Sequence, residues 1–227
     1  MIRVEKSQPA PPCLEKEKRK ASGDYKCDGV LERIKEDFFN KCYICECKEP
    51  ATINVEHFKP HRGDIDKKFD WNNLFWSCGH CNNIKSDRHD NILDCTNRDH
   101  DVENWLRYEM KPFPFEDVKI TSSNIQNDCA QKVENTVLLL SRIYNGTTEL
   151  KIIESQNIRD KLLDEIIDFQ QALKEYYEDC LEDDERERVL RKIKRHLKRT
   201  SAFTAFKRWI VKENKRFKKD FGDYLND

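Results

Sequence analysis

Apolar residues recur at helical spacing through the second half of the chain, with polar or charged residues between them. Three such stripes follow one another in the order Leu162, Ile166, Phe169, Leu173 and Tyr177, then Leu190, Ile193 and Leu197, and then Phe203, Phe206 and Ile210. This spacing puts the apolar side chains on one face of each helix. Gly146 and the acidic residues 182–184 are expected breaks. We therefore expect a helical bundle over residues 101–227.

The pattern is more varied over residues 30–100. Val30, Ile34 and Phe38 have the spacing of one short helix, whereas residues 52–56 alternate between polar and apolar side chains as a half-buried strand does. Proline and glycine at residues 59–64 predict a turn. The first half of the chain therefore mixes helix and strand.

Two further segments complete this central region. Residues 71–76 predict a second strand or the approach to a helix, and residues 81–88 predict a short helix. The expected fold class is therefore α+β and mostly helical, with a small central α+β domain and a helical C-terminal region.

Residues 1–29 predict an extended N-terminal arm. Pro9, Pro11 and Pro12 disfavour a helix, and the mixed-charge stretch after them has little apolar surface to bury. The expected domain organisation is thus an arm over residues 1–29, a core over 30–100 and a helical region over 101–227.

Charge is unevenly distributed along the 227 residues. Charged residues make up 37% of the chain, well above the usual quarter or so, and 42 Lys+Arg nearly cancel 43 Asp+Glu. Residues 185–219 contain 15 Lys+Arg and 3 Asp+Glu, which leaves 27 against 40 elsewhere. A basic segment behind an acidic body fits a surface that binds polyanions, and equally a solvated helix face.

The composition also bears on the compartment. No run of 18 apolar residues occurs, so a transmembrane helix and a membrane partner are not expected. The first residues lack the apolar centre of a secretory signal, and we expect a cytoplasmic protein. In a reducing compartment the ten cysteines are expected to be metal ligands or free thiols rather than disulfides.

Two C-x-x-C pairs are the strongest motif. Cys42 with Cys45, and Cys78 with Cys81, have the spacing that lets two thiolates bind one tetrahedral zinc ion. Cys47 or His80 could replace one of these ligands. A redox function would need a thioredoxin-like βαβ context, which the pattern lacks. The remaining cysteines are expected to be ordinary thiols, at positions 13, 27, 47, 95, 129 and 180.

Residues suited to phosphodiester hydrolysis lie between and just after these pairs. Histidine can take a proton from water near neutral pH, and His57 stands directly after Glu56. Glu56 and Asn82 offer the oxygen ligands that Mg²⁺ prefers, while Asn73 can orient a neighbour by hydrogen bonding. Residue types alone do not single out this chemistry, because Glu-His pairs are common.

The segment from Cys42 to Asp87 resembles the HNH nuclease family, whose ββα-metal fold is a hairpin followed by a helix. The resemblance rests on the two C-x-x-C pairs, on Glu56-His57 between them, on Asn73-Leu74, and on the Cys-Asn-Asn-Ile-Lys ending. It covers about a fifth of the chain and contains the expected motifs in order.

The resemblance implies a role for each residue. His57 would be the general base, and Glu56 and Asn82 would bind a catalytic divalent metal, Mg²⁺ or Mn²⁺. Asn73 would orient the His57 imidazole, and Lys85 would face the phosphate unless it is a solvated helix lysine. Adjacent strand residues point to opposite faces, so Glu56 and His57 can serve one site only if the strand bends or ends there.

The flanking segments are similar to a narrower group, the HNH subunits (PtuB) of Septu-type anti-phage defence systems, some found with retrons. The similarity lies in MIRVEKS, the proline-rich arm, KCYICE, WNNL, CNNIKSD and SAFTAFKRWI. It implies an antiviral effector nuclease bound to an ABC/SMC-like ATPase subunit (PtuA), and in some cases to a retron RNA–DNA element. DNA is the expected substrate, and RNA stays open. Trp209, Phe203 and Phe206 would dock a partner, or form ordinary core.

A second hypothesis from a different class is a non-catalytic zinc-binding module that uses the basic C-terminal helices to bind nucleic acid or a protein. It predicts zinc without divalent-dependent cleavage. The first hypothesis is favoured by the joint presence of Glu56, His57, Asn73 and Asn82, which a binding module does not need.

Overall fold

The computed structural model describes residues 1–123 and 128–226 of the chain. Its long helices are α6 (Ala130–Asn145), α7 (Glu149–Tyr176), α8 (Asp183–Leu197) and α9 (Thr204–Glu213). The shorter ones are α1 (Pro12–Lys18), α2 (Val30–Asp37), α3 (Ile65–Phe69), α4 (Gly79–Lys85), α5 (Val102–Trp105), α10 (Lys215–Phe221), η1 (Trp71–Asn73) and η2 (Gly222–Leu225). None of these helices is both long and apolar enough to cross a bilayer.

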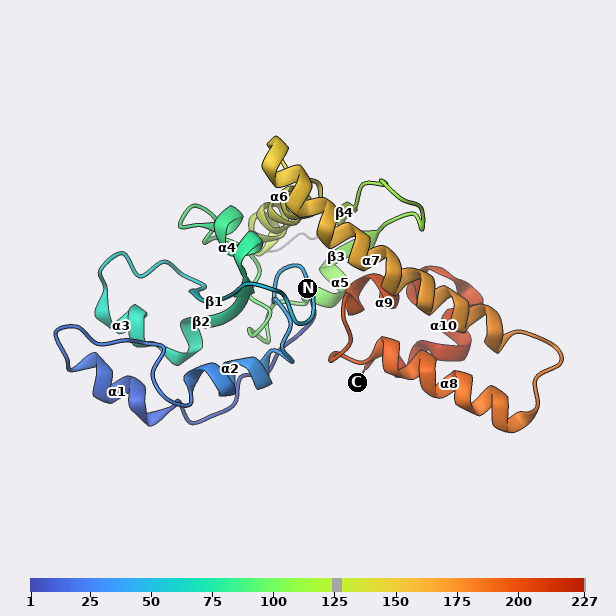
Figure 1. Cartoon of the computed structure of the whole chain (residues 1–227), viewed down its shortest axis with the longest axis horizontal. Helices are drawn as coiled ribbons and strands as arrows, with labels where there is room; N and C mark the ends of the chain where they lie inside the picture. The colour runs from blue at the N-terminus through green and yellow to red at the C-terminus, as the bar shows by residue number, and fades with distance from the viewer. Residues whose placement is uncertain (124–127, 227) are drawn as a thin grey trace.

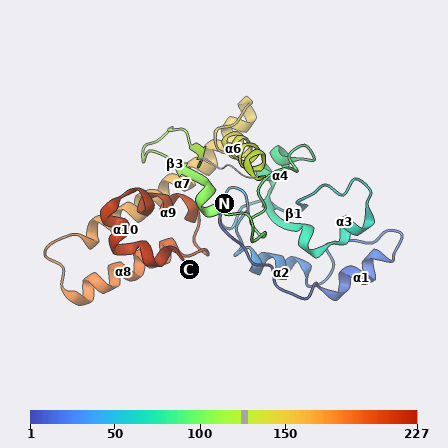
Figure 2. The ribbon, with the colours of Figure 1, turned by 180° about the vertical axis from the view of Figure 1, so that it is seen from behind.

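Two small antiparallel sheets accompany the helices, which hold about half of the residues. One sheet pairs β1 (Ile53–His57) with β2 (Leu74–Cys78), and the other pairs β3 (Leu106–Glu109) with β4 (Lys119–Ser122). Figure 1 shows α1 to α4 and the first sheet on the left and α8 to α10 on the right, with α7 running between them; Figure 2 shows the same arrangement from behind. The predicted α+β class with extensive helix is therefore confirmed.

The first sheet and α4 form a hairpin followed by a helix. Ile53 lies opposite Cys78 and His57 opposite Leu74, and β2 continues directly into α4. Residues 71–76 were expected to be a strand or the approach to a helix, and they turn through η1 before β2 begins at Leu74. The predicted strand and short helix on either side are present with shifted ends.

The N-terminal segment is not the extended arm that its prolines predict. Helix α1 begins at Pro12, where the missing N–H of proline would have had no helical partner anyway. Met1, Ile2, Val4 and Leu14 are each at most 4% exposed. The prediction was wrong because a few apolar side chains among the charges are enough to anchor the segment in the core.

Cys13 and Cys27 form a disulfide, which corrects the expectation that both are free thiols. The bond closes the turn between α1 and α2, and α1 itself packs on α3 through a Lys18–Asp66 ion pair of 2.7 Å. The sequence carried no sign of the pairing, because only the reversal of the chain after α1 brings the two cysteines together.

The C-terminal helices follow the predicted stripes and form α7, α8 and α9. Gly146 ends α6 with a φ of 74°, a conformation that glycine adopts at little cost. Phe203 and Phe206 are 1% and 2% exposed within the larger hydrophobic core. Of the two alternatives for these aromatics, ordinary core packing, which their helical spacing favours, is therefore confirmed, and docking of a partner is wrong for them.

Part of the basic C-terminal segment is buried in ion pairs. The Lys207 ammonium is fully buried 2.7 Å from Glu165, and the Arg208 guanidinium is 2% exposed with Nη1 2.7 Å from Glu103. These two cations therefore belong neither to a polyanion surface nor to a solvated helix face. They join α9 to α7 and α5.

We predict that the Cys13–Cys27 bond stabilises the fold. Replacing both residues by serine removes a constraint on a 15-residue loop, and the free energy of unfolding in urea should fall by about 3 kcal/mol under oxidising conditions. Reduction by TCEP should lower the stability of the wild type to that of the variant and leave the variant unchanged. Equal unfolding midpoints for both proteins without reductant would contradict the prediction.

Candidate metal centre and active site

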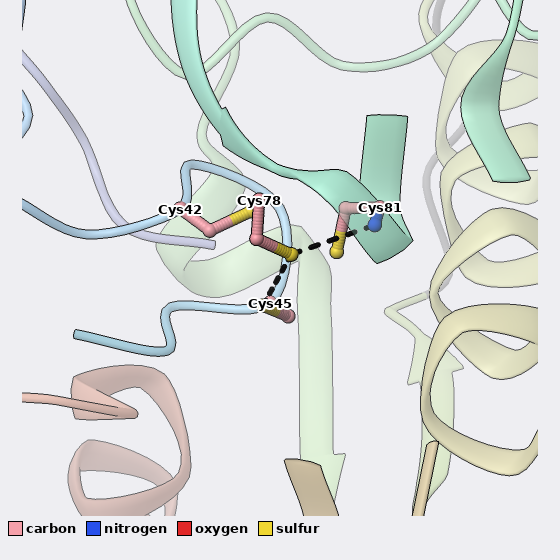
Figure 3. Close-up of side chains that lie close together, drawn as sticks. All are labelled: Cys42, Cys45, Cys78 and Cys81. Atoms are coloured by element: carbon pink, nitrogen blue, oxygen red, sulfur yellow. Dashed lines mark hydrogen bonds between the residues drawn. The ribbon is translucent and has the colours of Figure 1, made fainter. Parts of the chain in front are cut away.

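Four cysteine side chains gather between the hairpin and the loop that precedes it. Cys42 and Cys45 lie in the loop after α2, while Cys78 and Cys81 lie where β2 passes into α4 (Figure 3). Their sulfur atoms are buried and lie within 4.8 Å of one another. The backbone N–H of Tyr43 donates to the Trp76 carbonyl at 3.0 Å, which holds the loop beside β2.

The spacing of the sulfurs fits a tetrahedral ion. Zinc–sulfur bonds of about 2.3 Å separate the ligand atoms by about 3.8 Å, and the sulfurs of Cys45 and Cys78 are 3.9 Å apart. Contacts with Cys42 and Cys78 raise the pKa of Cys45, and burial raises the pKa of Cys81, both well above the usual range. Although burial opposes the shift, hydrogen bonds with the other three cysteines lower the pKa of Cys42. The buried cluster could hold a structural metal such as zinc.

The two alternative ligands have other partners. Cys47 contacts the Lys48 carbonyl at 3.8 Å. The ring nitrogens of His80 lie 2.6 Å from Glu154 Oε2 and 2.9 Å from the Ile143 carbonyl, which ties α4 to α6 and α7. Across residues 1–123 and 128–226, the only group of three or more cysteine, histidine, aspartate or glutamate side chains placed to share one metal ion consists of the four predicted cysteines.

Glu56 is a buried carboxylate on β1, 6% exposed. Its Oε1 accepts a hydrogen bond from the Tyr43 hydroxyl and lies 3.4 Å from Lys85 Nζ. Burial raises the pKa of Glu56 to about 7, although Lys85 and Tyr43 oppose this shift. In the described structure Oε2 makes no hydrogen bond, so one oxygen of the carboxylate is held and the other remains available.

Lys85 is 1% exposed and lies inside the ββα unit. Its ammonium donates to the Phe58 carbonyl at 2.9 Å and to the His57 carbonyl at 3.4 Å, as well as facing Glu56. The side chain runs from the last turn of α4 to the end of β1. This geometry supports neither a phosphate contact nor a solvated lysine, and gives Lys85 the role of holding Glu56.

The His57 ring is oriented by the backbone. Its Nε2 lies 2.9 Å from the Lys68 carbonyl, which can only accept, so Nε2 carries the proton and Nδ1 has the free lone pair. The ring packs edge-to-face with those of Tyr25 and His61, whose centroids are 4.6 and 4.8 Å away. Burial lowers the pKa of His57, which favours the neutral ring that a general base requires.

Asn73 acts on His57 through the loop rather than by direct contact. Its amide donates to the carbonyls of Lys59 and Lys67 at 2.9 and 3.0 Å, and its carbonyl accepts from the Lys59 N–H at 2.7 Å. The next carbonyl along the chain, that of Lys68, is the one that holds His57. Asn73 therefore fixes the segment that orients the imidazole.

Glu56, His57 and Asn82 line one cleft of about 420 Å³. The strand β1 ends at His57, which allows both adjacent residues to reach the same cleft. Asn82 lies on α4 directly after Cys81, and its side chain makes no hydrogen bond to any other residue that the structure describes. The arrangement can present a neutral imidazole beside two uncommitted oxygen ligands.

Sequence reasoning missed four other residues of this cleft, Tyr25, Lys26, His61 and Arg62. A second histidine four positions after His57 could have indicated that this segment belongs to the site, but residues 59–64 were interpreted only as a turn. Tyr25 and Lys26 had no signal, since they belong to the segment predicted to be an extended arm.

Comparison of the sequence with protein-family models and with curated proteins gave no match. The chemistry of the cleft is therefore argued from its geometry and from the sequence resemblance alone.

We predict that the purified chain binds about one zinc ion through the four-cysteine cluster. Cys81→Ser should lose most of the bound zinc, because three thiolates no longer close the tetrahedron, and should unfold at a lower temperature. The measurement is zinc released to a colorimetric chelator after treatment with a thiol reagent. Cys47→Ser is the matched control and should keep its zinc; loss of zinc in that variant instead would contradict the assignment.

We also predict that Lys85→Met destabilises the fold by about 3 kcal/mol, because it leaves the Glu56 carboxylate buried without its cation. Adding Glu56→Gln to that variant should restore part of the loss. Urea unfolding at pH 7 measures both effects. The exposed neighbour Lys59→Met is the control and should change stability by less than about 0.5 kcal/mol. Equal effects of the two lysine variants would show that the Lys85 contacts do not matter.

Proposed function

We propose that this protein is a metal-dependent HNH endonuclease that hydrolyses phosphodiester bonds in nucleic acid. The observation that carries the proposal is the shared cleft of Glu56, His57 and Asn82, which are supplied by a β-hairpin and the helix after it. A carboxylate, an amide and a histidine with a free Nδ1 are the groups that this reaction needs.

In the proposed reaction His57 takes a proton from water at Nδ1, and the resulting hydroxide attacks phosphorus while the bond from phosphorus to the leaving oxygen breaks. The leaving oxygen departs with the electron pair of that bond and takes a proton from solvent water. The Lys68 carbonyl holds the proton on Nε2, so Nδ1 is the only ring nitrogen that can accept. When the ring gains the proton, the Lys68 carbonyl keeps its hydrogen bond to Nε2 and holds the imidazolium in place.

Glu56 Oε2 and the Asn82 side-chain oxygen would hold Mg²⁺ or Mn²⁺, both of which prefer oxygen ligands. Such an ion would stabilise negative charge on the phosphate and on the leaving oxygen. Tyr43 and Lys85 fix the other oxygen of Glu56, and this leaves Oε2 available to the ion. The cysteine cluster would keep α4, and with it Asn82, against the hairpin.

The wider assignment follows the sequence resemblance. We propose a cytoplasmic effector of bacterial anti-phage defence that works with an ABC/SMC-like ATPase subunit (PtuA), and in some systems with a retron RNA–DNA element. DNA is the expected substrate, and RNA is the alternative. Burial of Lys207 and Arg208 in ion pairs supports dependence on a partner, because it reduces the basic surface with which the chain could bind nucleic acid alone.

A non-catalytic zinc module remains the second candidate, and one observation favours it. Glu56 Oε1 is engaged by Tyr43 and Lys85, as the carboxylate of a purely structural buried pair would be. This candidate leaves Oε2 of Glu56 and Nδ1 of His57 without a role.

The proposed function predicts that His57→Ala lowers the rate of cleavage by at least about 100-fold, the usual contribution of a general base. Plasmid DNA and a long RNA would be incubated with zinc-loaded protein and Mg²⁺ or Mn²⁺, with and without a co-expressed ATPase. His89→Ala, a histidine outside the cleft, should cut at the wild-type rate. Zinc content and melting temperature should be unchanged in both variants.

Two outcomes would contradict this assignment. Cleavage by His57→Ala at the wild-type rate would remove the proposed base. A wild-type protein that binds zinc but cuts neither substrate with either divalent metal, alone or with the ATPase, would favour the non-catalytic module.

A further inference from the structure

The ring of His57 contacts two other rings of the candidate cleft. The ring centroids of Tyr25 and His61 lie 4.6 and 4.8 Å from that of His57. The residue after each of these two rings is a cation that also lines the cleft, Lys26 after Tyr25 and Arg62 after His61. The proposed base therefore shares its cleft with two permanent positive charges, each next in sequence to a ring that it contacts.

The two cations differ in the hydrogen bonds and ion pairs that they already make. Within the ranges that the structure describes, Lys26 makes no ion pair, and its ammonium lies 5.6 Å from the Tyr25 ring. Arg62 is 66% exposed, and its Nη2 lies 3.1 Å from the Asp87 carbonyl and 3.7 Å from Asp90. Lys26 can therefore turn to an anion without breaking a pair, whereas Arg62 is already oriented by the loop that follows α4.

The segment that carries Lys26 is held in place from several directions. The Cys13–Cys27 disulfide closes it one residue away, and Lys68 Nζ donates to the Gly23 carbonyl at 2.9 Å. Gly23 packs so closely on α1 that a Cβ atom there would lie 1.9 Å from the Glu17 carbonyl oxygen. Figures 1 and 2 both show α1 beside α3, next to the hairpin. The segment that bears Tyr25 and Lys26 is therefore held in place as one wall of the cleft.

The charges that line the cleft define the class of ligand. Lys26 and Arg62 are balanced by the carboxyl groups of Glu56 and Asp87, so the empty cleft has no strong excess of either sign. Two cations that come from separate segments of the lining, with the carboxylate of Glu56 in the hydrogen-bonded interior, suit a chain of phosphates better than one compact anion.

We propose that Lys26 and Arg62 form a phosphate-binding subsite that holds the backbone of a nucleic-acid strand on both sides of the phosphodiester beside His57. This subsite deepens the proposed endonuclease and rests on it for the identity of the scissile bond. It assigns to the N-terminal segment, through Tyr25 and Lys26, one wall of the substrate channel. The contacts are to phosphate and carry no base specificity.

The test separates binding from cleavage. Full-length, zinc-loaded His57→Ala protein would be titrated against a fluorescein-labelled 20-nucleotide single-stranded DNA, and against the same sequence as RNA, from 25 to 200 mM KCl. Lys26→Met and Arg62→Met, each added to this background, should each reduce the slope of log K against log salt by about 0.7. That change corresponds to about eightfold weaker binding at 50 mM salt relative to a 1 M reference.

Lys16→Met is the matched control, because Lys16 is exposed on α1 and does not line the cleft. It should leave the slope and the affinity unchanged. Unchanged binding in both Lys26→Met and Arg62→Met would overturn the subsite, as would equal weakening by Lys16→Met, which would mean attraction by overall charge. Absence of binding to either oligonucleotide at 25 mM KCl would also overturn it.

A cleavage assay with His57 intact distinguishes the two proposals. Lys26→Met should raise KM about fivefold or more with kcat within about twofold, because the contact is made equally in the ground state and the transition state. Cleavage with KM, affinity and salt slope all unchanged in the variants would overturn the subsite and leave the endonuclease standing. Binding that depends on Lys26 and Arg62, in a protein that never cleaves, would support the subsite and overturn the endonuclease.

Discussion

The arrangement of the site depends on four buried sulfur atoms that must lie within 4.8 Å of one another. Cys42 and Cys45 belong to the loop after α2, whereas Cys78 and Cys81 fix the point where β2 becomes α4. A two-stranded hairpin has little stability of its own in water. A metal held by these thiols would supply folding free energy where the hairpin, the loop and the helix meet. Asn82 follows Cys81 directly, so the cysteine cluster fixes the position of the residue that we propose as a ligand of the catalytic ion.

A buried pair of opposite charges connects this scaffold to the chemistry. Glu56 and Lys85 are both almost fully buried, and neither would be stable there without the other. Lys85 also binds the carbonyls that end β1, so it fixes the backbone at His57 as well as the carboxylate before it. Replacing the pair by apolar side chains would cost the fold little. A buried pair with one free carboxylate oxygen is therefore better explained by a role in the cleft than by stability.

Local spacing explains what could be predicted from the sequence. The four-cysteine cluster and the stripes of α7, α8 and α9 follow from short-range patterns, because two-residue spacers and helical periods are local properties. The pairing of Cys13 with Cys27 and the burial of Lys85 depend on segments that meet only after the chain has folded. Tyr25 reaches the cleft for the same reason. Positions set by neighbours in sequence were predictable, and positions set by neighbours in space were not.

The charge asymmetry of the chain has a structural origin as well. The Glu103 carboxylate pairs with Arg208 and Arg199, and its backbone carbonyl accepts a hydrogen bond from Lys212 at 2.8 Å. One acidic residue from the first half of the chain therefore binds three cations of the basic segment. Glu165 likewise accepts a hydrogen bond from Lys207, another cation of this segment. Part of the positive charge of the basic segment is thus neutralised by ion pairs inside the molecule, and these pairs hold α9 against α5 and α7. Because these cations are unavailable to a polyanion, the field that a nucleic acid meets is weaker than the sequence count implies. Under the proposed function, the binding free energy for nucleic acid must then come from specific contacts in the cleft and from a partner protein rather than from the overall charge.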